Sequence, residues 1–156
     1  KTVNLSPEVF QGRSVAAAAI AAHECGHAVQ HSTSYFWLGM RSKMVPVVNA
    51  SSRIMQFVFI ASIFGMYSLS MGGNTILLVL IGTQAVIASF AVITLPVEYD
   101  ASRRALVWLK GAGITNPQNH NMAEDALKWA ARTYLVAAVA AVTQLLYYVM
   151  IYLRRN

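Results

Sequence analysis

The chain has 156 residues, of which 56% are hydrophobic and only 12% carry a charge. A soluble domain normally has about twice that charged fraction, so the composition indicates an integral membrane protein and excludes an ordinary soluble domain. The net charge of +6 comes from basic residues beside apolar segments, which we interpret as determinants of membrane topology and not as a nucleic-acid-binding surface.

The first five residues, Lys1-Thr2-Val3-Asn4-Leu5, alternate between polar and apolar side chains. This alternation predicts a short edge strand, to which a peptide substrate can add as a further strand, although a frayed terminus explains it equally well. Ser6, Pro7 and Glu8 then predict a helix start, with Ser6 as its N-cap. Because the chain opens at Lys1 without a Met and without an apolar targeting segment, we interpret it as part of something longer, from which an upstream N-terminal span is missing.

The central motif is His23-Glu24-Cys25-Gly26-His27, which matches the pattern H-E-x-x-H. It lies in the alanine-rich run Val15–Gln30, which predicts a helix. Residues four apart share a helix face, so His23 and His27 can direct two imidazoles at one ion. Zinc suits such ligands, and Glu24 can act as general base on a zinc-activated water that attacks a peptide carbonyl. Two surface histidines without a shared role are the alternative, which is disfavoured because polar groups in an apolar run need partners.

Three further residues lie within or near the motif. Ser14 precedes the alanine-rich run and is the expected N-cap. Cys25 is the single cysteine, which excludes an internal disulfide and a thiolate cluster, and we interpret it as a small buried residue. His31 lies about 12 Å along a helix axis from His23, too far to share an ion whose bonds to nitrogen are about 2 Å long. We therefore interpret His31 as an interfacial residue or as a neighbour of a ligand.

The middle of the chain predicts a transmembrane hairpin. Tyr35-Phe36-Trp37 begins an interfacial stretch, which continues with the basic residues Arg41, Lys43 and Arg53. Two uncharged apolar segments follow, Ile54–Leu69 and Thr75–Leu95, each long enough to cross a bilayer with its flanking residues. Met71–Asn74 is the expected tight turn between them, and Pro96 is expected to break the second segment.

The second apolar segment leads to Glu98, the third metal ligand that we expect. An unpaired carboxylate is disfavoured at the end of an apolar run, so Glu98 needs a partner. Ser102 lies one helical turn further on and can hydrogen-bond a ligand. The alternative is that Glu98 pairs with Arg103 or Arg104 at the membrane interface.

The last part of the chain contains a loop and a third span. Gly111–Asn121 is rich in turn-forming residues, Glu124–Arg132 predicts an amphipathic helix start, and Tyr134–Leu153 predicts the third span. Three residues are candidates for stabilising a developing oxyanion, and no spacing argument selects among them: Tyr99, Arg103 and His120.

We therefore expect a mainly α membrane protein with one domain over residues 1–156. Residues 1–33 form the strand and motif helix, 54–95 the hairpin, 96–133 the third-ligand helix and loop, and 134–153 the third span. Basic residues flank the hairpin and are absent from its turn, so the positive-inside rule places the motif helix at the cytoplasmic membrane surface. Arg154 and Arg155 then lie on the opposite side, against the rule.

Three segments together resemble a known family. They are Leu5–Ser14, Ala22–Ala28 and Leu95–Ala105, and in this order they resemble the YugP-like membrane neutral zinc metallopeptidases (zinc peptidase 2) over nearly the whole chain. The layout is more distantly similar to HtpX and the CAAX-processing gluzincins, where H-E-x-x-H and E-x-x-A-D supply two histidines and a glutamate. The resemblance implies zinc ligands His23, His27 and Glu98, with Glu24 as base. Ser102 stands where those relatives carry an aspartate, which puts its role in doubt.

The predicted function is a membrane-bound zinc metalloendopeptidase that acts on peptides or membrane proteins in quality control or processing. We expect it in a bacterial cytoplasmic membrane, with an organelle membrane of bacterial descent as the alternative. Two other functions stay open: a catalytically inactive homologue that serves as a structural or assembly subunit of a membrane complex, and a site-2-type intramembrane protease. The latter is disfavoured because the stretch Asn116-Pro117-Gln118-Asn119 lacks the aspartate ligand of those enzymes.

Overall fold

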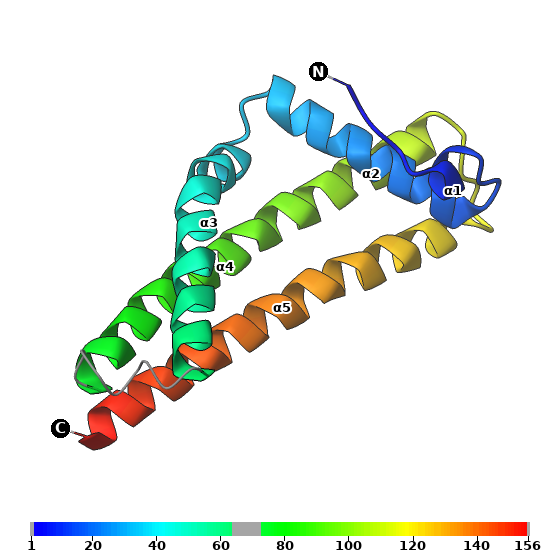
Figure 1. Cartoon of the computed structure of the whole chain (residues 1–156). Coiled ribbons are helices and arrows are strands. Elements are labelled where there is room, and N and C mark those ends of the chain that lie inside the picture. The colour runs from blue at the N-terminus through cyan, green and yellow to red at the C-terminus, as the bar shows by residue number, and fades with distance from the viewer. Residues whose placement is uncertain (1, 64–72, 156) are drawn as a thin grey trace. The chain divides into compact units, whose positions relative to one another are not determined.

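A computed structural model of the chain describes residues 2–63 and 73–155. These residues form five helices and contain no strand (Figure 1). The helices are α1 (Pro7–Phe10), α2 (Val15–Ser32), α3 (Phe36–Ile63), α4 (Gly73–Gly111) and α5 (His120–Arg155). The fold is therefore mainly α, as predicted.

The predicted helix starts of α1 and α2 are both confirmed. The hydroxyl of Ser6 accepts a hydrogen bond from the backbone N–H of Val9, and that of Ser14 accepts one from Ala17. The predicted edge strand is not confirmed, because residues 2–5 have no regular secondary structure. A strand is held by backbone hydrogen bonds to a neighbouring strand, and the described residues offer none.

The chain divides into two compact units, which we describe separately. The first unit comprises Lys1–Gly39 and Thr94–Leu135, and it contains α1, α2 and the adjoining parts of α4 and α5. The second unit comprises Met40–Ile93 and Val136–Asn156. It contains most of α3 and the remainder of α4 and α5.

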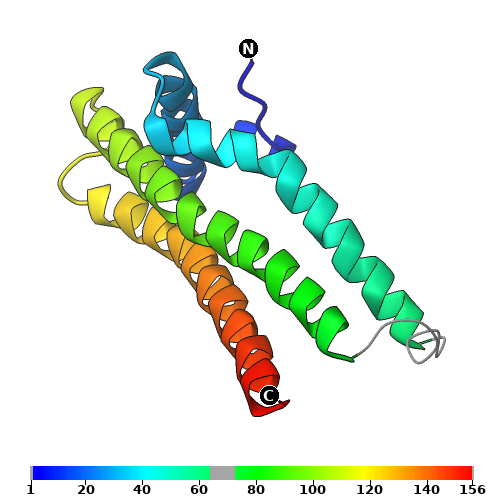
Figure 2. The ribbon, with the colours of Figure 1, turned by 90° about the vertical axis from the view of Figure 1, so that its left-hand side faces the viewer.

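Small side chains dominate the core of the first unit. In this unit α2 crosses the C-terminal part of α4, and α4 and α5 run antiparallel on either side of a short loop (Figures 1 and 2). Each of the three helices contributes two buried residues: Ala19, Ala22, Ala105, Leu109, Ala123 and Leu127. Four of these six are alanines, so the helix backbones can approach closely.

The prediction that Pro96 breaks the second apolar segment is wrong, because α4 continues through Pro96 to Gly111. A proline inside a helix removes one backbone hydrogen bond and costs about 3 kcal/mol. Here the residues that follow are tightly packed, since Val97 and Ala101 have no exposed surface. Burial of these side chains offsets the cost, so the apolar segment and the Glu98 segment form one helix.

Three helices are long and apolar enough to cross a membrane, as predicted. The candidate spans are Phe36–Ala61, Asn74–Gly111 and His120–Arg155, with mean hydropathies of 1.3, 2.5 and 1.9. In the most apolar window of each, only 6%, 28% and 6% of the residues are buried, so most of this surface needs an apolar surrounding such as lipid.

The boundaries of these spans differ from the predicted ones. The first begins at Phe36 and not at Ile54, because helix α3 also includes the stretch that we interpreted as interfacial, with Pro46 inside it. Residues 64–72, which include the end of the first predicted segment and the start of the predicted turn, lie outside the described residues. The rest of that turn, Gly73 and Asn74, begins helix α4.

Within the second unit, buried polar side chains are paired along and between helices. The side-chain amide of Gln84 on α4 donates to the backbone oxygen of Ala141 on α5 at 2.9 Å. The hydroxyl of Thr83 donates to the backbone oxygen of Val79, one turn earlier, at 2.8 Å. Such pairing removes the large penalty of an unsatisfied polar group among apolar side chains.

Candidate metal centre

The candidate centre forms where α2 crosses α4 in the first unit. Gly26 of α2 lies at this crossing, since a Cβ atom added to it would be 2.6 Å from the backbone oxygen of Ala101 on α4. A real Cβ atom does not lie this close to a backbone oxygen. Only glycine at position 26 therefore allows the two helix backbones to be in contact. As a result, His23 and His27 on α2 lie directly opposite Glu98 on α4.

Glu98 presents one carboxylate oxygen to both imidazoles. Its Oε2 atom is 3.2 Å from Nε2 of His23 and 3.5 Å from Nε2 of His27. The carboxylate is 3% exposed, and the two histidine side chains are 14% and 21% exposed. The sequence predicted these three residues as one ligand set, and the structure brings them together.

The spacing of these atoms fits a tetrahedral zinc site. The three potential ligand atoms all lie within 4.8 Å of one another. Zinc is bound at about 2.0–2.2 Å by imidazole nitrogen and carboxylate oxygen, so two tetrahedral ligands are about 3.3 Å apart. The distances from Glu98 to His23 and His27, 3.2 and 3.5 Å, lie on either side of this value. The donor set of two neutral imidazoles and one carboxylate also suits zinc.

The structure does not favour the alternative pairing of Glu98 with the nearby arginines. Both guanidinium groups contact Asp100 instead, Arg103 at 2.6 Å and Arg104 at 2.6 Å. Arg103, Arg104 and Asp100 form ion pairs over three and four residues of one helix, where side chains are neighbours. The carboxylate of Glu98 is therefore directed to the imidazoles.

Each imidazole has a second polar neighbour at its other ring nitrogen. Nδ1 of His23 is 3.1 Å from the hydroxyl oxygen of Ser102, as the sequence suggested. Nδ1 of His27 is 3.0 Å from the amide oxygen of Gln30, a residue that the sequence analysis missed. Its position three residues after His27 on the same helix was the available signal. Both rings thus direct Nε2 toward Glu98.

The carboxylate also changes the protonation of one ring. The hydrogen bond to Glu98 raises the pKa of His27 above its ordinary value, with burial opposing the rise and the contact to Gln30 adding to it. In the metal-free protein this pair therefore attracts a proton, which a metal ion would replace.

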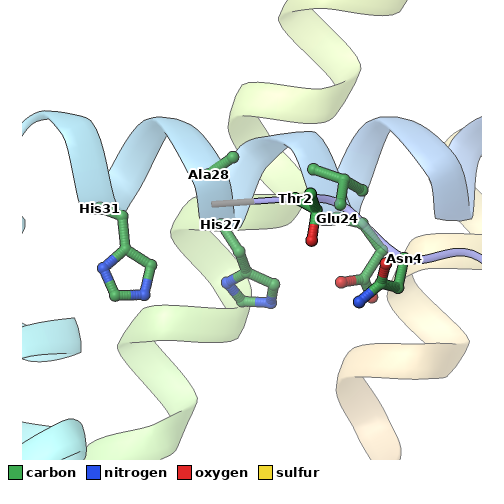
Figure 3. A pocket seen from close by; sticks show the side chains of 7 residues that line it. Thr2, Asn4, Glu24, His27, Ala28 and His31 are labelled. Carbon is green, nitrogen blue, oxygen red and sulfur yellow. The ribbon is translucent and has the colours of Figure 1, made fainter.

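Two cavities adjoin the centre, and Glu24 lines both. The larger one, of about 500 Å³, lies between α2 and the N-terminal segment, with Thr2, Asn4, His27 and His31 around it. Figure 3 shows Glu24, His27 and His31 on one side of α2, with the segment that carries Thr2 and Asn4 running alongside. Glu24 is therefore next to both the ligand set and a space that can hold a peptide.

The smaller cavity, of about 210 Å³, lies on the other side of Glu24. Helix α5 supplies most of its apolar lining, with Leu127, Ala130 and Ala131, and also Tyr134, which the sequence analysis did not single out. His23, Glu98 and Ser102 complete the lining. No sequence pattern linked α5 to the motif, because this proximity arises only from the packing of three helices.

The remaining predicted site residues lie elsewhere. Tyr99 is 49% exposed, and Arg103 is held by Asp100, so neither lines a cavity beside the ligand set. His120 was assigned to a loop, but it is the first residue of α5 and its Nδ1 lies 2.8 Å from the hydroxyl of Thr115. Cys25 was predicted to be buried, which is wrong: it is exposed, because it faces away from the side of α2 that packs on α4.

Comparisons with known proteins identify the family of the chain. The family model described as "Putative neutral zinc metallopeptidase" matches residues 1–153. A protein of Bacillus subtilis (strain 168) named "Putative membrane protease YugP" is 39% identical over 153 residues. The match covers 98% of this chain and 65% of that relative, so the chain spans about two thirds of the relative's length. No solved structure matches the chain.

Proposed function

The chain belongs to the family described as "Putative neutral zinc metallopeptidase", and from this premise we propose that it is a membrane-bound zinc metalloendopeptidase. One observation carries the proposal: a single oxygen of Glu98 lies 3.2 and 3.5 Å from Nε2 of His23 and His27. A buried carboxylate next to two imidazoles is one of the ligand sets that bind zinc in proteins. The proposed cofactor is therefore Zn²⁺, held by His23, His27 and Glu98.

The catalytic step that we propose is hydrolysis of a peptide bond with Glu24 as general base. Zinc supplies Lewis acidity, which brings the pKa of a water down to about 7. Glu24 takes a proton from the water that attacks the peptide carbonyl, and it later gives a proton to the leaving amine as the C–N bond breaks. Its position supports both roles, because it lines the two cavities beside the ligand set.

The cavities support a peptide as the substrate. Residues 2–5 have no regular secondary structure, so their backbone groups can pair with an extended peptide in the larger cavity. The smaller cavity has an apolar wall on α5, which fits a substrate side chain. We propose that peptides or membrane-protein segments enter here, in protein quality control or processing.

The surroundings that we propose are a bacterial cytoplasmic membrane, with the centre on the cytoplasmic side. The support comes from the three candidate spans and from the positions of the basic residues on either side of the hairpin. The single domain that we proposed for residues 1–156 would then combine a catalytic part, the first unit, with a membrane part, the second.

Zinc content tests the proposal directly. Wild-type protein purified in detergent without chelator should contain one zinc per chain, and the Glu98→Ala variant should contain little or none. Glu124→Ala is the matched control, because Glu124 is a carboxylate on α5 paired with Lys128 and it lines neither cavity. Wild-type protein without zinc would overturn the enzymatic proposal, and Glu98→Ala that keeps its zinc would remove Glu98 from the ligand set.

A further inference from the structure

Gln30 is the most completely buried polar residue near the centre, with no exposed surface. Its side-chain nitrogen donates to the backbone oxygen of Val97 at 2.8 Å and to Oδ2 of Asp100 at 3.0 Å. Its side-chain oxygen lies 3.0 Å from Nδ1 of His27. Gln30 thus connects α2 to two acceptors on α4 and contacts a proposed metal ligand.

These contacts allow only one orientation of the Gln30 amide. Its two N–H groups meet two acceptors, the carbonyl of Val97 and the carboxylate of Asp100. If the amide were rotated by half a turn, its oxygen would face both acceptors, and two buried donors would lose their partners. The amide oxygen must therefore face His27.

The orientation of the amide in turn fixes the protonation of the imidazole. An amide oxygen only accepts, so Nδ1 of His27 must carry a proton and donate it to Gln30. Nε2 is then the ring atom left for a metal ion, and it lies 3.5 Å from Glu98. In the metal-free protein a proton held between Nε2 and the carboxylate of Glu98 occupies this position, and a metal ion would replace it.

Asp100 is itself held in place at the end of this chain of contacts. It is 7% exposed and accepts hydrogen bonds from Arg103 and Arg104, both at 2.6 Å. The arginines balance its charge, so that a carboxylate can remain buried beside Gln30. The order of contacts therefore runs from the arginines through Asp100 and Gln30 to His27.

We infer that Gln30 and Asp100 are positioning residues, which hold His27 in the tautomer and orientation that bind zinc through Nε2. This inference rests on the proposed zinc site and adds the source of its preorganisation. Partners of this kind typically change metal affinity by about 10- to 100-fold when they are removed. The two histidines also differ: His23 has the hydroxyl of Ser102 as its partner, which can both donate and accept and so does not select a tautomer.

The first test uses the metal-free Glu98→Ala protein, in which no carboxylate holds a proton on Nε2 of His27, so it needs neither zinc nor activity. Long-range proton–nitrogen NMR of protein with ¹⁵N-labelled histidine, at a pH where imidazoles are neutral, reports the tautomer of each ring. The chain has 4 histidines, and a His27→Gln spectrum identifies the signals of His27. We expect the Nδ1–H form in Glu98→Ala and a mixture of both forms when Gln30→Met is added to it, because Met keeps the length of the side chain and removes its hydrogen bonds.

The second test measures zinc affinity by competition with a chromogenic chelator. Gln30→Met should bind zinc about 10- to 100-fold more weakly than wild type. Gln118→Ala, which alters a glutamine in the exposed loop between α4 and α5, should leave both the affinity and the tautomer unchanged. A folded Gln30→Met protein with unchanged tautomer and unchanged affinity would overturn the inference.

A second pair of variants covers the case in which Gln30→Met does not fold. Asp100→Ala removes one acceptor of Gln30 and should shift both readouts in the same direction, whereas Asp100→Asn keeps an acceptor oxygen and should restore them. Arg103→Gln removes an arginine contact of Asp100 without touching Gln30, and it controls for the lost ion pair. If the Glu98→Ala protein showed the Nδ1–H tautomer but the wild type bound no zinc, the proposed function would fail and the positioning of His27 would stand.

Discussion

Gly26 on α2 and Ala101 on α4 are in direct backbone contact: a Cβ atom at position 26 would lie 2.6 Å from the carbonyl oxygen of Ala101. Gly26 is one residue before His27, and Ala101 lies three residues after Glu98. The contact therefore sets the separation between the two helices at the level of the proposed ligands. Gly26 has no side chain to bind a metal ion or a substrate, but its contact determines whether the two histidines lie close to Glu98.

The first prediction concerns this contact. Gly26→Ala should reduce the zinc content and lower the free energy of unfolding by about 1–3 kcal/mol, because the added methyl group forces the helices apart. Zinc analysis and thermal unfolding in detergent measure the two effects. Gly39→Ala is the matched control, since a Cβ there has nothing within 4 Å; it should leave the zinc content unchanged and raise the free energy of unfolding by about 0.5–1 kcal/mol through helix propensity. Normal zinc content in Gly26→Ala would show that the centre tolerates a wider crossing.

The second prediction separates metal binding from catalysis. Glu24→Gln should retain the zinc of the wild type, because Glu24 is not among the three clustered ligand atoms. Peptide hydrolysis should fall by about 100- to 10,000-fold, since an amide cannot accept the proton of the attacking water. Hydrolysis is followed with a quenched fluorescent peptide in detergent or liposomes. If both proteins bind zinc and the wild type cleaves none of the peptides, the prediction is contradicted and the structural-subunit alternative is favoured.

The sequence predicted that three residues lie together, but not the contacts that support them. The proximity of His23, His27 and Glu98 was predictable because helical spacing aligns two histidines and because a carboxylate at the end of an apolar segment needs a partner. Gln30 and Asp100 were missed because a glutamine or an ion pair on a helix is ordinary until tertiary packing buries it. The same reason explains the role of α5, whose small apolar residues gave no chemical signal.

Two predictions from local sequence patterns were not confirmed, a helix break and a strand. Pro96 predicts a break from local backbone chemistry alone, but Val97 and Ala101 are fully buried beside it and keep the helix intact. The alternation of the first five residues predicts a strand, but residues 2–5 have no partner strand in the described chain. A bound peptide can supply that partner, so the pattern is consistent with the proposed substrate.

The third prediction concerns substrate preference. Ala130 is an exposed residue of α5 that lines the cavity of about 210 Å³ beside His23 and Glu24. Ala130→Leu should narrow this cavity, so that cleavage next to bulky side chains falls relative to cleavage next to small ones, by about 10-fold or more for a clash of a few methylene groups. Mass spectrometry of a digested peptide library gives the ratio.

A matched control exists on the same helix for this change. Ala137→Leu adds the same side chain at an exposed position of α5 that does not line the cavity, and it should leave the preference unchanged. An unchanged ratio in Ala130→Leu would mean that the substrate side chain next to the cleaved bond lies in another part of the centre, and the larger cavity would be the next to alter.

The fourth prediction tests the orientation in the membrane and uses Cys25 as a reporter. Cys25 is the only cysteine of the chain, it is exposed, and it lies on α2 between the two proposed histidine ligands. If the basic residues beside the hairpin lie in the cytoplasm, a membrane-impermeant maleimide should label Cys25 only after the cells are lysed. The measurement is the mass shift of the purified protein from intact and from lysed cells.

Two variants make the labelling result decisive. Cys25→Ser should remove all labelling of the chain. In that background, Arg155→Cys places a thiol at the end of the third candidate span, which should be labelled in intact cells because three crossings put it on the opposite side. Labelling of Cys25 in intact cells would place the centre outside the cytoplasm and would show that the positive charges of Arg154 and Arg155 outweigh those around the hairpin. If both thiols were labelled only after lysis, the last helix would not cross the membrane, and the positive-inside rule would hold for every basic residue in the chain.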